Sequence, residues 1–298
     1  MGKMTITDGV WAKEDEVNFF NTSLSVAPKG KLFYLTNDGR YLAYWPKNYR
    51  GTKTTLQSRN GRIGEYTEKW SKDLIEPIAR ELGFYAVNNV ICDEVGLSND
   101  SPADVAICRN SNTRQRPENI IAIFEVKMSI VWNWQCMQNG TTYQLQCLGD
   151  YNSHIGTPGL LRSDTMLKAI GKSVGIRTAS GRASIIPIII LGNTPIQESY
   201  KTKVDNLKSY GIIQGFWSLN PHPLDNGNYI HNTDGFGFKT ISSITELRNN
   251  IAALLNNNST FFAGWKSKED LGRMIELADS EITYRLKAER FLQLINGG

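Results

Sequence analysis

The sequence predicts an α/β fold in which helices flank a mixed central sheet, with a β-hairpin added before this core and helices added after it. Two observations carry this prediction. A helical pattern near residues 62–82 precedes three short β-prone runs, and two further apolar runs, 185–191 and 212–219, alternate with helical patterns. A meander of strands followed by crossover helices gives a sheet with both antiparallel and parallel neighbours.

Size and composition agree with this class. The chain has 298 residues, of which 40% are hydrophobic and 21% are charged, as in ordinary globular proteins. At about 150 residues per domain, this length fits two domains or one large domain with additions. We expect an N-terminal addition at 1–60, a core at 61–220, and a mostly helical segment at 221–298 that packs on the core. The net charge of +4 excludes a histone-like polycation and an acidic mimic, but it identifies no partner.

The sequence gives no sign of a membrane or of an oxidising compartment. No run of 18 apolar residues is present, and no apolar region follows the N-terminus, so we expect no membrane partner and a cytoplasmic protein. The cysteines form no CxxC pair and have no histidine at zinc spacing. We expect reduced, mostly buried thiols at Cys92, Cys108, Cys136 and Cys147.

The N-terminal half begins with a hairpin signal. Asp38-Gly39 lies between two aromatic, β-prone runs at 31–35 and 41–45. The helix that follows has apolar residues three and four positions apart and ends before Gly83. Pro77 lies within it and predicts a kink or a split into two helices.

The three β-prone runs are 87–95, 103–108 and 120–128. The last is almost continuously apolar, which predicts a central strand buried on both faces. We expect a helix at 142–151 and another at about 165–174, whose N-terminus would be capped by the residues Ser163-Asp164-Thr165.

The C-terminal half adds further helices. A helix is expected at 196–210, closed by Gly211, and a loop at 221–234 that is rich in Pro, Asn and Gly. The last 50 residues are mostly helical, with an amphipathic stripe of Leu271, Met274, Ile275, Ala278, Ile282 and Leu286.

Charged residues interrupt two of the predicted strands. Glu125 and Lys127 are two residues apart, so they point to the same face of the apolar strand. If the preceding strand pairs beside it, Asp104 reaches the same place. Two converging carboxylates repel and raise one pKa unless a cation lies between them. Hard oxygen ligands of this kind suit Mg²⁺, and Lys127 could lower the pKa of a metal-bound water or orient that water.

The tripeptide Glu-x-Lys is not specific by itself, because about one is expected by chance in a chain of this length. The alternative is an edge strand that carries a surface Glu/Lys pair. The buried-strand pattern, an acid on the preceding strand and the Pro102 that precedes it favour a site.

These residues resemble a known family. Pro102-Ala103-Asp104 and Glu125-Val126-Lys127 are similar to the motif of the PD-(D/E)xK nuclease superfamily, with Ala103 inserted between the Pro and the Asp. The resemblance covers about residues 61–220, and the layout is most similar to Type II restriction endonucleases. It implies a restriction-endonuclease-like core and a Mg²⁺ cofactor held by Asp104, Glu125 and the main-chain carbonyl of Val126. Lys127 would position or activate the water.

Such nucleases often carry a further acid on the helix that precedes the sheet. The candidates are Glu65 and Glu68, and Glu68 is preferred because the pattern Gly64-x-x-x-Glu68 is similar to that of several of these nucleases. The alternative is that both are solvated acids stabilised by the helix dipole.

Two acid-poor segments, 41–63 and 159–197, flank the predicted site and could bind phosphates. The expected DNA contacts are Lys47, Arg50, Lys53, Arg59, Arg62, Arg162, Lys168 and Lys172. For each of them, a solvated helix or loop face is the alternative. The amide-rich segment 132–152 could lie against DNA, or Trp132 and Trp134 could belong to the core. The three histidines, His154, His222 and His231, form no catalytic grouping.

The resulting expectation is a Mg²⁺-dependent, site-specific endonuclease for double-stranded DNA that works as a homodimer, with a cognate DNA methyltransferase encoded nearby. Two alternatives remain open. One is a structure-selective, repair or defence nuclease with the same core. The other is a DNA-binding protein without catalytic activity.

Overall fold

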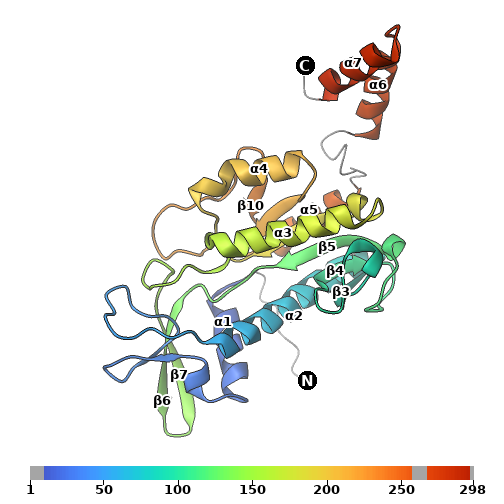
Figure 1. Cartoon of the computed structure of the whole chain (residues 1–298). Helices are drawn as coiled ribbons and strands as arrows, with labels where there is room; N and C mark the ends of the chain where they lie inside the picture. Colours follow the sequence, from blue (N-terminus) through green and yellow to red (C-terminus); the bar gives the residue numbers. More distant parts are fainter. Residues whose placement is uncertain (1–9, 257–266, 296–298) are drawn as a thin grey trace.

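The computed structural model describes residues 10–256 and 267–295 and is built around a six-stranded sheet in the order β10-β9-β8-β5-β4-β3 (Figure 1). The strands β3, β4 and β5 pair antiparallel, whereas β5, β8, β9 and β10 pair parallel. The bounds are Tyr85–Val90 for β3, Ala103–Cys108 for β4, Ile120–Val126 for β5, Ile188–Gly192 for β8, Gly215–Ser218 for β9 and Phe238–Thr240 for β10. The predicted α/β class with a mixed sheet is confirmed.

Helices cover both faces of this sheet because its strands are apolar on both sides. Helix α2, Gln57–Glu81, packs on one face and α3, Ser163–Ala179, on the other, with β5 between them in Figure 1. Along β4 and β5 the side chains alternate: Val105 and Phe124 belong to the core under α2, and Ala106 and Ile123 to the core under α3. Helix α4, Lys201–Ser209, and α5, Ile244–Asn256, complete these two layers.

A second, antiparallel sheet lies at one end of the molecule (Figure 1). Its strands in order are β1 (Tyr34–Leu35), β2 (Tyr41–Leu42), β6 (Asn133–Asn139) and β7 (Thr142–Gly149). The predicted hairpin at Asp38-Gly39 is confirmed, and Gly39 adopts a positive φ of 80° in its turn. The helix predicted at 142–151 is wrong. In β7, half-buried Leu145 and Cys147 alternate with exposed glutamines, which is a strand period rather than a helical one.

Helix α1, Lys13–Leu24, was not predicted from the sequence, and it links this second sheet to the core. The carboxylate of Glu16 on α1 is fully buried and accepts hydrogen bonds from the backbone N–H of Val131 (2.5 Å), that of Trp132 (3.3 Å) and the indole of Trp134 (2.7 Å). Burial raises the pKa of Glu16 to about 8. Trp132 and Trp134 are both buried in the core, so the interpretation of these tryptophans as core residues is confirmed.

Several predicted helix boundaries move. Helix α2 begins at Gln57 rather than near residue 62, and Pro77 lies inside one continuous helix instead of splitting it. The predicted capping residues lie inside α3, because the helix begins at Ser163 and its N-cap position is Arg162, which provides no side-chain cap. The carboxylate of Asp164, in the first turn, pairs with Arg162 at 2.7 and 2.9 Å. The turn after α4 closes at Gly211, whose φ is +70°. Strand β10 lies in a region for which no strand was predicted.

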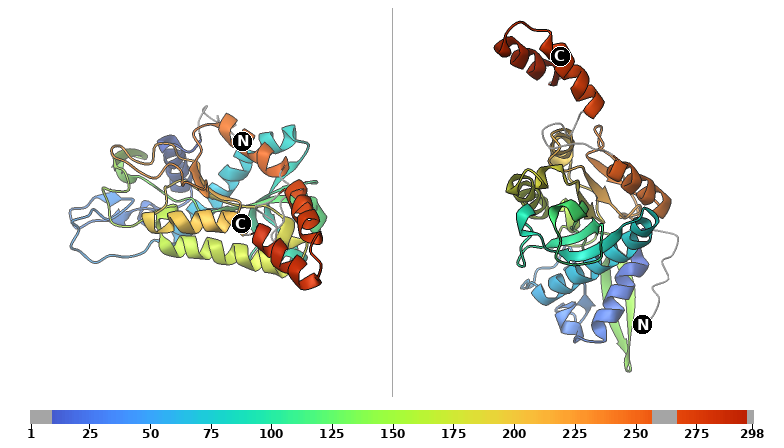
Figure 2. Two further views of the ribbon diagram at one scale, coloured as in Figure 1. Left: turned by 90° about the horizontal axis from the view of Figure 1, so that it is seen from above. Right: turned by 90° about the vertical axis from the view of Figure 1, so that its right-hand side faces the viewer.

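The C-terminal helices differ in their packing. Helix α5 contributes Leu247 and Ile251 to the core. Helices α6, Lys268–Asp279, and α7, Tyr284–Ile295, pair with each other and stand apart from the sheets (Figure 2). Of the amphipathic stripe, Ala278 is buried, whereas Ile275, Ile282 and Leu286 are exposed.

None of the described helices has both the length and the apolar character needed to cross a membrane. The N-terminal residues on which the signal-sequence prediction depended lie outside the described ranges. All four cysteines are free thiols, and three of them are buried.

The buried carboxylate of Glu16 provides a test of how α1 is held. Replacing it (Glu16→Ala) leaves three N–H donors buried without an acceptor, so the free energy of unfolding should fall by about 3 kcal/mol. Urea denaturation measures this loss. The exposed neighbour Glu14 is the matched control, and Glu14→Ala should change stability by less than about 0.5 kcal/mol. Equal effects of the two substitutions would contradict this role of Glu16.

Candidate functional site

The sheet brings the predicted acids together. The register that pairs Val105 with Phe124 places Asp104 on β4 opposite Glu125 on β5. Both side chains are largely buried, with 14% and 5% of their surface exposed. The alternative of a surface Glu/Lys pair on an edge strand is therefore wrong, because β5 lies between β4 and β8 in the interior of the sheet.

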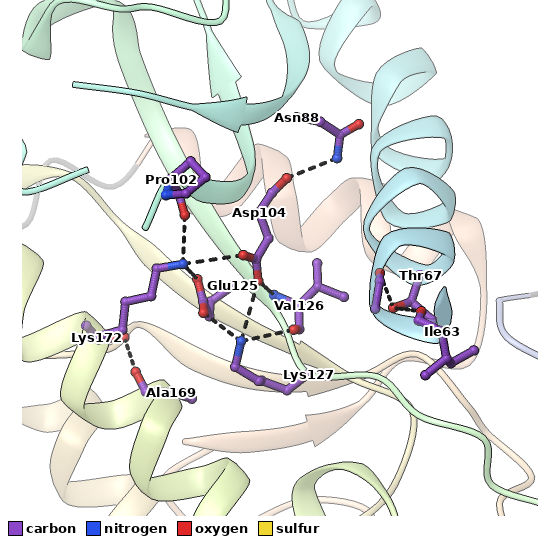
Figure 3. Close-up of polar contacts among 12 residues, drawn as sticks. Ile63, Thr67, Asn88, Pro102, Asp104, Glu125, Val126, Lys127, Ala169 and Lys172 are labelled. Atoms are coloured by element: carbon purple, nitrogen blue, oxygen red, sulfur yellow. Dashed lines mark hydrogen bonds and ion pairs between the residues drawn. The ribbon is translucent and has the colours of Figure 1, made fainter. Parts of the chain in front are cut away.

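The ammonium of Lys127 lies among three oxygens (Figure 3). Its Nζ is 2.6 Å from Oε1 of Glu125, 3.5 Å from Oδ2 of Asp104 and 3.1 Å from the carbonyl oxygen of Val126. The backbone N–H of Val126 donates to the same Oδ2 of Asp104 at 2.7 Å, which fixes that carboxylate. The oxygens expected to bind a metal thus converge on one cation position.

A second lysine completes the cluster from the opposite side (Figure 3). Lys172 Nζ on α3 is 2.6 Å from Oε2 of Glu125, 3.3 Å from Oδ1 of Asp104 and 2.7 Å from the carbonyl oxygen of Pro102. The prediction that Lys172 is a free phosphate contact on the surface is wrong, since its ammonium is engaged by both acids. One sequence signal could have shown this: Lys172 is three residues after Ala169 and next to Ser173, both on the buried face of α3.

Burial and charge together set the protonation of this cluster. Burial and the negative charge of Asp104 raise the pKa of Glu125, while the two ammonium groups oppose them. Burial alone would lower the pKa of Lys127, but the carboxylates of Glu125 and Asp104 outweigh it and raise that pKa. Lys127 therefore remains a cation at neutral pH.

Glu68 on α2 belongs to the same electrostatic environment. Burial first, and then the charge of Asp104, raise its pKa to about 7, with Lys127 acting in the opposite direction. The side chain of Asn88 ties this helix to the site, because its Nδ2 donates to the carbonyl oxygens of Glu68 (3.1 Å) and Asp104 (3.0 Å). Glu65 is exposed, so the structure favours Glu68 over Glu65 as the acid whose pKa the charges of the cluster affect.

The donor set fits a hard divalent cation. Within the described ranges, no three His, Cys, Asp or Glu residues form a ready-made metal centre. Two carboxylates and the Val126 carbonyl nevertheless point at one position that already attracts a cation. Mg²⁺ is commonly bound by one or two protein carboxylates, with water completing its coordination.

The predicted DNA contacts divide into exposed and engaged residues. Lys47, Arg50 and Lys53 are exposed in the loop between β2 and α2, and Lys168 is exposed on α3. Arg62 is half-buried on α2. Arg162 is exposed but is paired with Asp164.

Arg59 is not a surface residue, and its prediction as a DNA contact is wrong. Its side chain is 3% exposed and donates to the carbonyls of Leu32, at 3.3 Å, and Ala43. Its guanidinium also lies 5.1 Å from the ring centre of Tyr34 and 5.3 Å from that of Tyr44. Arg59 joins the start of α2 to the second sheet.

The histidines lie elsewhere. The ring of His154 stacks on that of Tyr44, which follows β2, with centroids 3.9 Å apart, and its Nε2 is 3.3 Å from the carbonyl oxygen of Val131. His222 and His231 are exposed in the loops after β9.

Comparison of the chain with known protein families, with characterised proteins and with solved structures gives no match. The functional interpretation therefore depends on the geometry of the site itself.

Arg59 and Lys53 provide a paired test of what the basic residues near the hairpin do. Arg59→Ala removes buried hydrogen bonds to two carbonyls and should lower the free energy of unfolding by about 2–3 kcal/mol. Lys53→Ala, at an exposed position, should change it by less than about 0.5 kcal/mol. Thermal unfolding distinguishes them, and an Arg59 variant as stable as the parent would contradict the anchoring role.

The raised pKa of Glu68 predicts a pH dependence of stability in metal-free buffer. The folded chain holds this proton up to about pH 7, above the ordinary value of 4.5. Its stabilising contribution is therefore complete below the unfolded pKa and is lost as the pH rises through 7. Between pH 5 and 8, the parent should lose about 1–2 kcal/mol more than Glu68→Gln, after allowance for solvent screening.

Urea denaturation in the presence of a chelator at each pH measures this difference. Glu65→Gln, at an exposed position of the same helix, is the control and should follow the parent. Parallel pH profiles for the parent and Glu68→Gln would show that Glu68 titrates normally.

Proposed function

We propose that this protein is a Mg²⁺-dependent, site-specific endonuclease for double-stranded DNA, with a restriction-endonuclease-like core. One observation carries the proposal. The carboxylates of Asp104 and Glu125 and the carbonyl of Val126 surround a single cation position, and a lysine two residues after Glu125 lies at it. The order of β3, β4, β5, α3 and β8 around that position supports the proposed core.

The reaction proposed is hydrolysis of a phosphodiester, in which a water oxygen bonds to phosphorus while the bond to the leaving oxygen breaks. Bound Mg²⁺ would neutralise charge that develops on the phosphoryl oxygens and activate the water. Asp104, Glu125 and Val126 would hold it. Lys127, which remains protonated, would donate hydrogen bonds to the water or to a phosphate oxygen.

Glu68 suits the proton transfer. Its pKa of about 7 lets it take up a proton at neutral pH, whereas an ordinary surface carboxyl would stay ionised. It lies on α2, at the other side of the cluster from Lys172 on α3. We therefore propose Glu68 as a catalytic acid or base that Glu65 cannot replace.

The DNA would lie across the end of the molecule that carries the second sheet. The exposed Lys47, Arg50 and Lys53 would contact phosphates there. The β6–β7 hairpin offers amides for contacts with base edges, because its exposed side chains include Gln138, Asn139, Gln144 and Gln146. Arg62, Arg162 and Lys168 would add phosphate contacts beside the site.

The proposal also covers the oligomeric state, the cellular location and a partner enzyme. Two copies of the chain would place two sites on opposite strands of a symmetric sequence, so a homodimer is proposed. A cytoplasmic location and a cognate DNA methyltransferase encoded nearby would accompany a restriction function.

Cleavage of a long linear duplex tests the proposal directly. The purified chain with Mg²⁺ should produce discrete fragments, and a chelator should abolish them. Asp104→Asn and Lys127→Met should each lower the cleavage rate by at least about 100-fold, because each removes a group at the reacting centre. The exposed residues Asp100 and Lys69 provide matched controls, and Asp100→Asn and Lys69→Met should cleave like the parent.

Other outcomes would replace the proposal. Cutting of branched DNA without cutting of linear duplex would indicate a structure-selective nuclease. DNA binding that no divalent metal converts into cleavage would indicate a binding protein. Fragments that persist in Asp104→Asn and Lys127→Met would place the chemistry at another site.

A further inference from the structure

The acid pair of the site is shared between two cations rather than one. Asp104 and Glu125 each give one oxygen to Lys127 and the other oxygen to Lys172. Each ammonium also meets one main-chain carbonyl, that of Val126 for Lys127 and that of Pro102 for Lys172. Each position is therefore lined by one oxygen of Asp104, one oxygen of Glu125 and one main-chain carbonyl oxygen (Figure 3).

We infer that Lys172 takes the place of a second divalent metal ion, so that the site binds one metal ion per chain. This inference rests on the proposed function, since it concerns the same metal site. Two carboxylates that bridge two cation positions, each completed by a carbonyl, have the arrangement that a pair of hard divalent ions requires. In this structure each of the two positions holds a lysine ammonium.

The two lysines are held by different parts of the chain. This difference indicates which ammonium group a metal ion would displace. Lys127 follows the end of β5, and its carbonyl partner is the residue next to it in the chain. Lys172 lies within the 17-residue helix α3, whose buried face packs on the sheet, and its partner Pro102 comes from a distant part of the chain. Lys172 is therefore the fixed cation, and the position beside Lys127 is the one open to exchange.

The charges of the four side chains also indicate that the site binds one metal ion. Asp104 and Glu125 supply two negative charges, and Lys127 and Lys172 already balance them. A single divalent ion beside Lys172 leaves an excess positive charge that suits a phosphate. A second divalent ion in the presence of Lys172 would face an ammonium at its own ligands.

The stoichiometry of Mn²⁺ binding to the full chain without DNA tests this inference. Titration calorimetry should give one Mn²⁺ for the parent and two for Lys172→Ala, which vacates the second position. Lys172→Arg keeps a cation there and should bind one. Lys168→Ala, one helical turn earlier and exposed, is the matched control and should also bind one.

Electron paramagnetic resonance of the Mn²⁺-loaded chains adds a readout that a merely structural role of Lys172 would not change. Two ions bridged by the same carboxylates give a spin-coupled spectrum, expected for Lys172→Ala and not for the parent. If Lys172→Ala does not fold by circular dichroism, Lys172→Ser is measured in its place. A spin-coupled pair in Lys172→Ser supports the inference equally.

The experiment distinguishes failure of this inference from failure of the proposed function. A parent chain that binds two Mn²⁺, or a folded Lys172→Ala or Lys172→Ser that still binds one, overturns the inference and leaves the proposed function intact. A parent chain that binds no Mn²⁺ at the site overturns the proposed function as well.

Discussion

Two carboxylates lie side by side on adjacent central strands, in a part of the sheet that water hardly reaches, and this is the constraint on which the site depends. Asp104 and Glu125 would repel each other there, and removing them from water is costly. The chain compensates with Lys127 from the end of β5 and Lys172 from α3. The position of α3 is thereby coupled to the site, because it carries one of the two compensating charges.

Another buried carboxyl group, that of Glu16, holds the N-terminal helix against the chain. Glu16 on α1 accepts hydrogen bonds from N–H groups of Val131, Trp132 and Trp134, in the segment that follows the site. This segment leads from Lys127 into strand β6 of the second sheet. The N-terminal helix, the candidate site and the proposed DNA-facing hairpin are consequently held in one arrangement by a short run of hydrogen bonds.

Positive charges in this chain have several different roles that composition cannot separate. Arg177 lies in the acid-poor segment 159–197, yet it is 4% exposed and donates to carbonyls of the loops before β8 and β9. Burial lowers its pKa to about 10. Arg59 anchors α2, and Lys172 compensates the acid pair. Lys47, Arg50 and Lys53, by contrast, are exposed in the loop between β2 and α2.

The sequence by itself determined the class of the fold and the acidic part of the site. Apolar continuity in 120–128 identified the central strand, and a spacing of two residues put Glu125 and Lys127 on one face of it, because side-chain direction in a strand is a local property. Only the tertiary structure decided that β7 is a strand, that Arg59 is buried, and that Lys172 reaches the acids. Each of these depends on which distant segment lies opposite, and a single helix or strand pattern does not contain that information.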